Sequence, residues 1–119
     1  MWRFIKRLGF ALCGLRLLIK TERHFQIHTI AFIMVIIIGC FFKISSYEWV
    51  AILLISGLVI VSEAINSSIE KLSDVITREH NPLIKQVKDI AAGAVLIAAI
   101  LALIIGLVIF YPYISKLFH

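Results

Sequence analysis

The side chains best suited to chemistry lie together in one polar segment that directly follows an uncharged stretch of the chain. On a helix with about 100° per residue, Glu63, Asn66, Glu70 and Asp74 fall within about 100° of arc. Three carboxylates and an amide therefore share one face. Because like charges stacked on one helix face repel each other, we expect a cation among them: a divalent metal ion, a lysine side chain, or both.

The place of this polar stripe, at the end of an apolar stretch, also bears on its role. Ionisable side chains there are costly in a membrane and normally face a bundle interior or an aqueous cavity. The alternative is that the helix has emerged into water, so that Glu70 and Asp74 form a solvated face. This alternative accounts least well for Glu63, which immediately follows fourteen uncharged residues. Glu63 is therefore the main candidate for a functional carboxylate.

Two further charged clusters are expected at the same membrane face. Glu22 ends the N-terminal segment, and Lys88 and Asp89 open the last apolar stretch. Each cluster could consist of ordinary charged residues at a membrane interface. Together with the polar stripe, however, the two clusters would place carboxylates from three segments in one plane. Oxygen ligands without cysteine suit Mg²⁺ better than zinc. Since Mg²⁺ held by one or two carboxylates usually also binds a phosphate, the pattern indicates a nucleotide site.

Composition identifies the class of protein that carries these residues. Of 119 residues, 61% are hydrophobic and 16% charged, whereas a soluble domain has about 45–50% apolar and about 25% charged residues. These values exclude an ordinary soluble globule and a disordered chain, and two cysteines are too few for a disulfide framework. The net charge of +5 is dispersed between apolar stretches, which favours a membrane surface over nucleic acid as partner. The length allows one domain, residues 1–119.

Three stretches are apolar enough to cross a membrane, so we expect an all-α integral membrane protein. Residues 90–115 form 26 consecutive positions without a formal charge, which is enough to span a bilayer. Residues 29–42 and 49–62 are shorter, and taken alone each could be a buried core helix. We interpret them as an antiparallel pair of spans, which predicts three membrane helices, over residues 28–43, 47–75 and 83–115. The second continues into the cytoplasm, and the turn signal Asn81-Pro82 separates it from the third.

Residues 1–21 have the pattern of an amphipathic helix that lies in the membrane interface. Their apolar side chains gather within about 140° of arc, and most of the basic side chains fall on the other side. Ten of the twelve lysine and arginine residues lie before the first span or between the second and third. This positive-inside pattern predicts a cytoplasmic N-terminus.

The polar segments resemble the signature of the small integral-membrane lipid kinases of bacteria, the prokaryotic diacylglycerol kinases and the related undecaprenol kinases. The resemblance rests on Glu63-Ala-Ile-Asn-Ser-Ser-Ile-Glu70, on Asp74, and on Lys88-Asp-Ile-Ala-Ala-Gly-Ala-Val-Leu96. It implies a homotrimer of the bacterial inner membrane, with three spans per chain and active sites between protomers on the cytoplasmic side. It also implies a Mg²⁺-dependent kinase that transfers the ATP γ-phosphate to a lipid hydroxyl.

The resemblance also implies roles for individual residues. Glu63 looks like the catalytic base that takes the proton from the lipid hydroxyl, and Glu22 and Glu70 resemble the Mg²⁺ ligands at the nucleotide. Further nucleotide contacts are implied for eight residues: Arg3, Phe10, Asn66, Glu79, His80, Asn81, Lys88 and Asp89. No role follows for Asp74 or His28.

The acceptor lipid and the function class leave alternatives. Glu22-Arg-His-Phe-Gln-Ile-His28 and His80-Asn-Pro-Leu look closer to the undecaprenol kinases, which favours undecaprenol over diacylglycerol as acceptor. The alternative function is a small proton-coupled transporter that uses membrane carboxylates as a relay. A transporter of this kind is expected to need a carboxylate near the bilayer midplane, whereas every span centre here is uncharged. The lipid kinase is therefore the favoured hypothesis.

Overall fold

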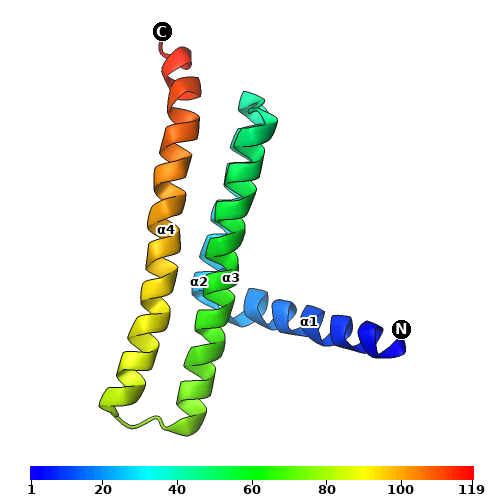
Figure 1. Ribbon diagram of the computed structural model, residues 1–119, viewed down its shortest axis with the longest axis vertical. Helices are drawn as coiled ribbons and strands as arrows, with labels where there is room; N and C mark the ends of the chain where they lie inside the picture. Colours follow the sequence, from blue (N-terminus) through cyan, green and yellow to red (C-terminus); the bar gives the residue numbers. More distant parts are fainter.

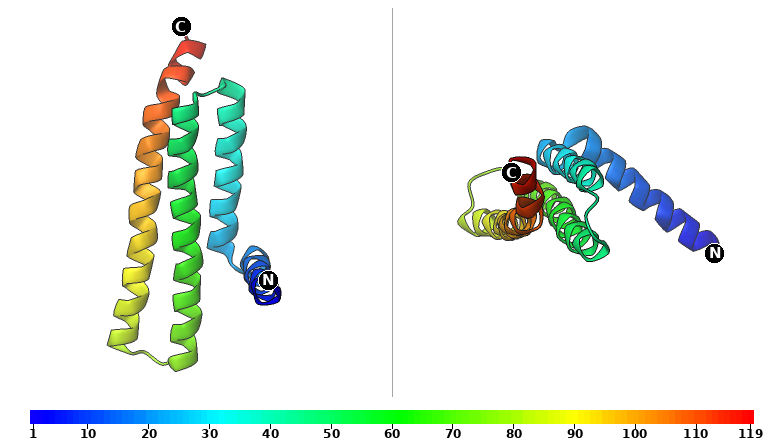
Figure 2. Two further views of the ribbon diagram at one scale, coloured as in Figure 1. Left: turned by 45° about the vertical axis from the view of Figure 1, so that its right-hand side comes forward. Right: turned by 90° about the horizontal axis from the view of Figure 1, so that it is seen from above.

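The computed structural model describes all 119 residues as four helices joined by short connections. The helices are α1 (Trp2–Thr21), α2 (Arg23–Phe42), α3 (Ser46–Ile76) and α4 (Pro82–Leu117). Helices α2, α3 and α4 lie side by side, whereas α1 projects away from them at the start of α2 (Figure 1). Figure 2 shows the same arrangement from another side and from above. The fold is all-α, as predicted.

Helices α2, α3 and α4 are each long and apolar enough to cross a membrane. This confirms the three predicted membrane helices by length and composition. Most of their large apolar side chains are exposed on the single chain, as expected where lipid or neighbouring chains cover them. The chain is therefore a membrane protein.

Local sequence signals account for the helix boundaries. Glu22 is extended and separates α1 from α2, so α2 begins ahead of the predicted span. Lys43 ends α2 in the left-handed region, with φ of 52°. Ser45 and Glu48 form a capping box at the start of α3. The Asn81 side chain accepts hydrogen bonds from two backbone N–H groups in the first turn of α4, at 2.9 and 3.3 Å.

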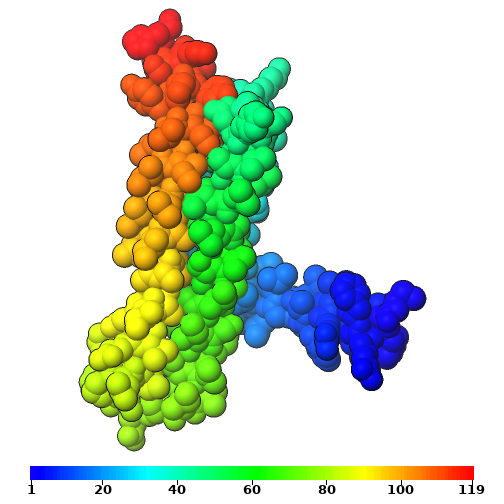
Figure 3. All heavy atoms as spheres, in the orientation of Figure 1, coloured from blue at the N-terminus to red at the C-terminus, as the bar shows by residue number.

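The bundle has two distinct ends. We call the end with the α2–α3 turn the turn end, and the end with the α3–α4 connection, residues 77–81, the loop end. Toward the loop end, α3 and α4 run past the level of α1 (Figure 1). Figure 3 shows α1 standing clear of the other helices, so that most of its surface is uncovered in the single chain. No residue of α1 is buried.

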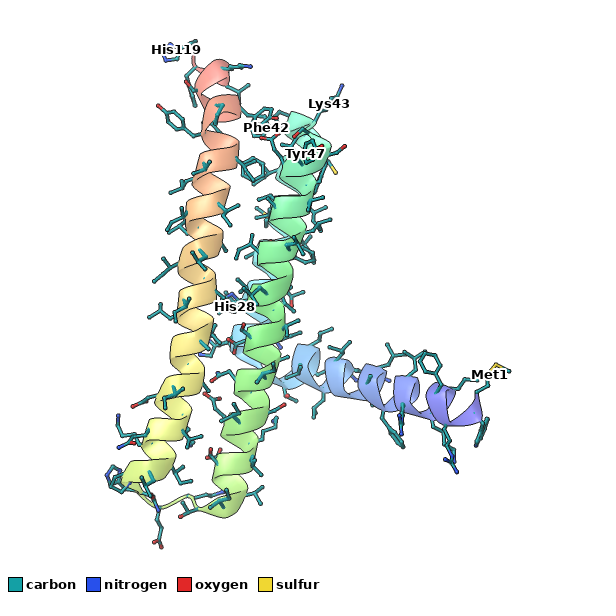
Figure 4. All side chains as sticks on the ribbon, in the orientation of Figure 1. Met1, His28, Phe42, Lys43, Tyr47 and His119 are labelled. Carbon is teal, nitrogen blue, oxygen red and sulfur yellow. The ribbon has the colours of Figure 1, made fainter.

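The apolar core lies at the turn end. Its buried centre consists of four side chains: Ile44, Ile52, Ile109 and Phe110. The ring of Phe42 packs 5.7 Å from that of Tyr113, and Figure 4 shows Phe42 between the turn and α4. The Tyr113 hydroxyl donates a hydrogen bond to the Glu48 carboxylate. These contacts connect α4 to the turn and so set how α4 lies along α3.

Gly39 makes a close contact with the ring of Trp49 at this end. A Cβ atom at Gly39 would lie 2.7 Å from Trp49 Cη2 and 3.2 Å from Ile44 Cδ1. Gly39→Ala should cost about 1–3 kcal/mol in overpacking, because the rigid ring must move. The better helix propensity of alanine offsets about 1 kcal/mol of this cost, so we expect a net destabilisation of up to about 2 kcal/mol.

The measurement is the midpoint of thermal unfolding in detergent micelles. Gly57→Ala is the matched control, because a Cβ there meets no atom within 4 Å. The control should unfold at the wild-type temperature or above it. A Gly39→Ala protein as stable as Gly57→Ala would contradict the predicted clash.

Candidate active site

The polar stripe of α3 begins buried and becomes exposed toward the loop end. Glu63 and Asn66 are only 4% and 7% exposed, whereas Glu70 and Asp74 are exposed. The reason is that α3 extends past the start of α2, so fewer helices cover its last turns (Figure 1). In the single chain, Glu70 and Asp74 are thus solvated, as the alternative interpretation expected, and Glu63 is not.

Glu63 faces His28, a residue of α2 to which the sequence assigned no role. The His28 Nε2 atom lies 3.8 Å from Glu63 Oε2, and the two side chains are 25% and 5% exposed. His28 also lines an apolar cavity of about 450 Å³ between α2, α3 and α4. Figure 4 labels His28 on α2, beside α3. No local pattern marks this pair, because the two residues belong to different helices and meet only through helix packing.

Asn66 lies between the buried and exposed parts of the stripe. Its Nδ2 donates a long hydrogen bond, 3.5 Å, to Glu70 Oε1. Its Oδ1 is buried and accepts no hydrogen bond from the chain. Because buried polar atoms are nearly always hydrogen-bonded, this oxygen is available to a water molecule or a ligand. Asn66 also lines a cavity of about 440 Å³ between α3 and α4.

Glu22 forms an ion pair that connects the start of α2 to α3. Lys71 Nζ lies 2.8 Å from Glu22 Oε1. Since Lys71 directly follows Glu70 in α3, the pair places Glu22 in the same region of the bundle as Glu70. Lys71 thus pairs with Glu22 rather than with a carboxylate of the stripe.

Lys88 and Asp89 lie near the start of α4 and form different ion pairs. Lys88 Nζ donates to Asp74 Oδ1 at 2.7 Å and so bridges α4 to α3. Asp89 accepts instead from Lys85, at 2.6 Å and one turn away within α4. The structure therefore places Lys88 beside the stripe, where it supplies the lysine expected among the carboxylates.

The remaining predicted nucleotide contacts lie apart from Glu63 in the single chain. Glu79, His80 and Asn81 are exposed in the connection at the loop end, and the Asn81 oxygen is engaged in capping α4. Arg3 and Phe10 are exposed on α1. Because α1 projects away from α3, one chain does not bring Arg3 and Phe10 to the stripe (Figures 1 and 3).

The donor atoms fit a Mg²⁺ ion that is held partly by phosphate. No three histidine, cysteine or acidic side chains come close enough to hold a metal ion by themselves. Mg²⁺ does not require such a cage, because it is commonly bound by one or two carboxylates together with substrate phosphates and water. The exposed Glu70 carboxylate offers an oxygen donor of this kind, and the Glu22 carboxylate would offer another once the half-exposed Lys71 side chain turns away from it.

Comparisons with known proteins place this arrangement in a family. A sequence model described as prokaryotic diacylglycerol kinase matches residues 9–110. An undecaprenol kinase of Bacillus subtilis strain 168 is 43% identical over 92% of this chain and 89% of its own length. A diacylglycerol kinase of Escherichia coli strain K12 is 31% identical over 93% and 91%. A diacylglycerol kinase of Helicobacter pylori strain J99 is 35% identical over 82% and 77%. The chain therefore belongs to the prokaryotic diacylglycerol kinase family and is a lipid kinase, as the sequence resemblance predicted.

Proposed function

We propose that this lipid kinase transfers the γ-phosphate of ATP to the hydroxyl of a membrane lipid, with Glu63 as the catalytic base. The observation that carries the proposal is the burial of Glu63, which is 4% exposed and directly follows an apolar run. Counted from Ser46 at 1.5 Å per residue, Glu63 lies about 26 Å along α3. The hydrocarbon core of a bilayer is about 30 Å thick. With Ser46 taken at one boundary of the core, Glu63 would lie near the opposite boundary, where the hydroxyl of a lipid would reach it.

Glu63 accepts the proton as the O–H bond of the lipid breaks, and the lipid oxygen forms a bond to the γ-phosphorus. The bond from that phosphorus to the β,γ-bridging oxygen breaks, and ADP leaves with the electron pair. The proton on Glu63 then passes to water. Phosphoryl transfer depends mainly on positioning and charge stabilisation, which suits a site with few reactive side chains.

We assign the nucleotide and metal roles in the same proposal. Glu22 and Glu70 would hold Mg²⁺, which when bound neutralises phosphate charge. Asn66 would direct its free Oδ1 toward the nucleotide site. Lys88 would turn from Asp74 to a phosphate, a movement that its partly exposed side chain permits. Asp89 and the three loop residues 79–81 would contact the outer part of the nucleotide.

We propose undecaprenol as the preferred acceptor, ahead of diacylglycerol. Support comes from the Bacillus subtilis relative, which carries that name and shares 43% identity, and from segments 22–28 and 80–83 of this chain. The two acceptors share a primary hydroxyl on a long apolar body, so the proposed chemistry is common to both. The choice between them then depends on what the apolar surfaces around Glu63 accommodate.

We further propose a homotrimer in the bacterial inner membrane, with a cytoplasmic N-terminus. In this arrangement α1 would lie in the membrane–water interface. The lipid there would cover apolar side chains that are exposed in the single chain: Phe4, Leu8, Leu12 and Leu15. Arg3 and Phe10 would then act at the site of a neighbouring protomer, because their own α3 is out of reach. The proposal is supported by the projection of α1 away from the bundle (Figure 2).

The test is an acceptor panel with purified protein and ATP radiolabelled at the γ-phosphate. Undecaprenol and a long-chain diacylglycerol are each dispersed in the same detergent and assayed separately. We expect label in the lipid fraction, with a higher kcat/KM for undecaprenol. Label in neither lipid would contradict the proposed reaction, and a preference for diacylglycerol would overturn only the acceptor assignment.

A further inference from the structure

The His28–Glu63 pair has a geometry that suits a catalytic role. The two side chains come from adjacent helices, and their closest atoms are 3.8 Å apart. This is longer than a hydrogen bond, which needs about 2.7–3.2 Å. Catalytic hydrogen bonds are often long in the absence of substrate and shorten when it binds. A small rotation of either side chain would bring Nε2–H into hydrogen-bonding contact with Oε2.

The surroundings of the two side chains favour a hydrogen bond between His28 and Glu63. The Glu63 side chain is 5% exposed, and His28 is the basic group within ion-pair distance of it. A buried carboxylate needs a compensating partner, because burying an unpaired charge is costly. On its other side the imidazole borders a cavity whose lining is mostly apolar, including Phe32, Ile55 and Val59. These side chains offer the imidazole no competing acceptor.

We infer that His28 is a positioning residue, which orients the Glu63 carboxylate for proton abstraction; this rests on the proposed role of Glu63 as base. By donating Nε2–H to Oε2, His28 holds the carboxylate in one rotamer and leaves Oε1 free for the lipid hydroxyl. His28 itself takes no proton from the lipid. The pair therefore works through the orientation of the base rather than through binding of either substrate.

Three substitutions at His28 test this inference. A glutamine amide nitrogen reaches nearly the position of Nε2, whereas an asparagine amide is shorter and reaches only the position of Nδ1. We expect His28→Ala and His28→Asn to lower kcat by about 10- to 100-fold, because a misplaced base loses that much. The KM values for ATP and acceptor should change by no more than about twofold. His28→Gln should recover most of the lost kcat.

Two further measurements separate positioning from a structural role. Binding of a non-hydrolysable ATP analogue should be unchanged in all three variants. In a Glu63→Gln background, His28→Ala should lower the residual rate no further, because both changes remove one function.

Several results would overturn the inference. One is a wild-type kcat in His28→Ala. Others are a change in that variant confined to the KM for the acceptor, or loss of its binding of the ATP analogue. A further one is an additional loss of rate when His28→Ala is combined with Glu63→Gln. If wild-type protein phosphorylates no lipid, the proposed function itself fails, which the acceptor panel shows independently.

Discussion

Glu63→Gln is expected to remove lipid phosphorylation while ATP binding is retained. The amide keeps the size of the side chain but cannot accept the hydroxyl proton, and loss of a general base lowers turnover by about 10²- to 10⁴-fold. The effect should fall on kcat, because Glu63 is buried and is not among the residues proposed to contact the nucleotide. The measurement is initial-rate transfer of radiolabelled phosphate to undecaprenol, together with equilibrium binding of a non-hydrolysable ATP analogue.

Glu48→Gln is the matched control for this experiment. Glu48 lies at the turn end, where it caps α3 and accepts a hydrogen bond from Tyr113. The same chemical change there should leave kcat unchanged, although it can lower the unfolding temperature. Wild-type turnover in Glu63→Gln would exclude Glu63 as the base. Loss of analogue binding in that variant would instead indicate that Glu63 supports the nucleotide site.

Glu70→Gln is expected to raise the Mg²⁺ concentration required for half-maximal activity by at least about tenfold. Glu70 is an exposed carboxylate one turn beyond Asn66, and losing its charge removes one of two proposed metal ligands. Nucleotide binding in the presence of Mg²⁺ should weaken in parallel. Binding measured with excess chelator should be the same in variant and wild type, because the metal then makes no contribution.

Asp74→Asn is a matched control for Glu70→Gln. Asp74 lies one turn farther along the same stripe and is paired with Lys88. The Mg²⁺ requirement of Asp74→Asn should stay close to that of the wild type, because this carboxylate is not a proposed ligand. An unchanged Mg²⁺ requirement in Glu70→Gln, or equal shifts in both variants, would count against the assignment of Glu70.

Much of the architecture can be predicted from the order of residues because helices are local structures. The uncharged runs predicted three spans, and the turn signal Asn81-Pro82 predicted the break before the last helix. The spacing of Glu63, Asn66 and Glu70 placed them on one face by helical periodicity alone. The signature around Glu63 and Lys88 predicted the family, which the comparisons confirmed. The individual roles of these residues remain predictions, to be decided by the experiments above.

Other features could not be predicted, because they depend on how helices pack. The sequence marked Glu63 as the carboxylate of the stripe that fits a solvated face least well, but the packing of the helices decides that it is buried while Glu70 and Asp74 are exposed. Lys71 attracted no notice in the sequence, yet it pairs with Glu22 across the gap between α2 and α3. The direction of α1, which keeps Arg3 away from the stripe, is likewise a property of the break at Glu22.

The contact between His28 and Glu63 depends most clearly on the tertiary structure. The position of His28 at the edge of an apolar stretch is typical of many membrane proteins, so the residue type alone predicts nothing about its partner. The relative rotation of α2 and α3 brings its imidazole to 3.8 Å from Glu63. Hydrophobic periodicity and charge patterns extend over a few neighbouring residues, so helices and their polar faces can be predicted from the sequence. The pairing of side chains from separate helices depends on the crossing and rotation of those helices, and these are decided by the packing of the whole bundle.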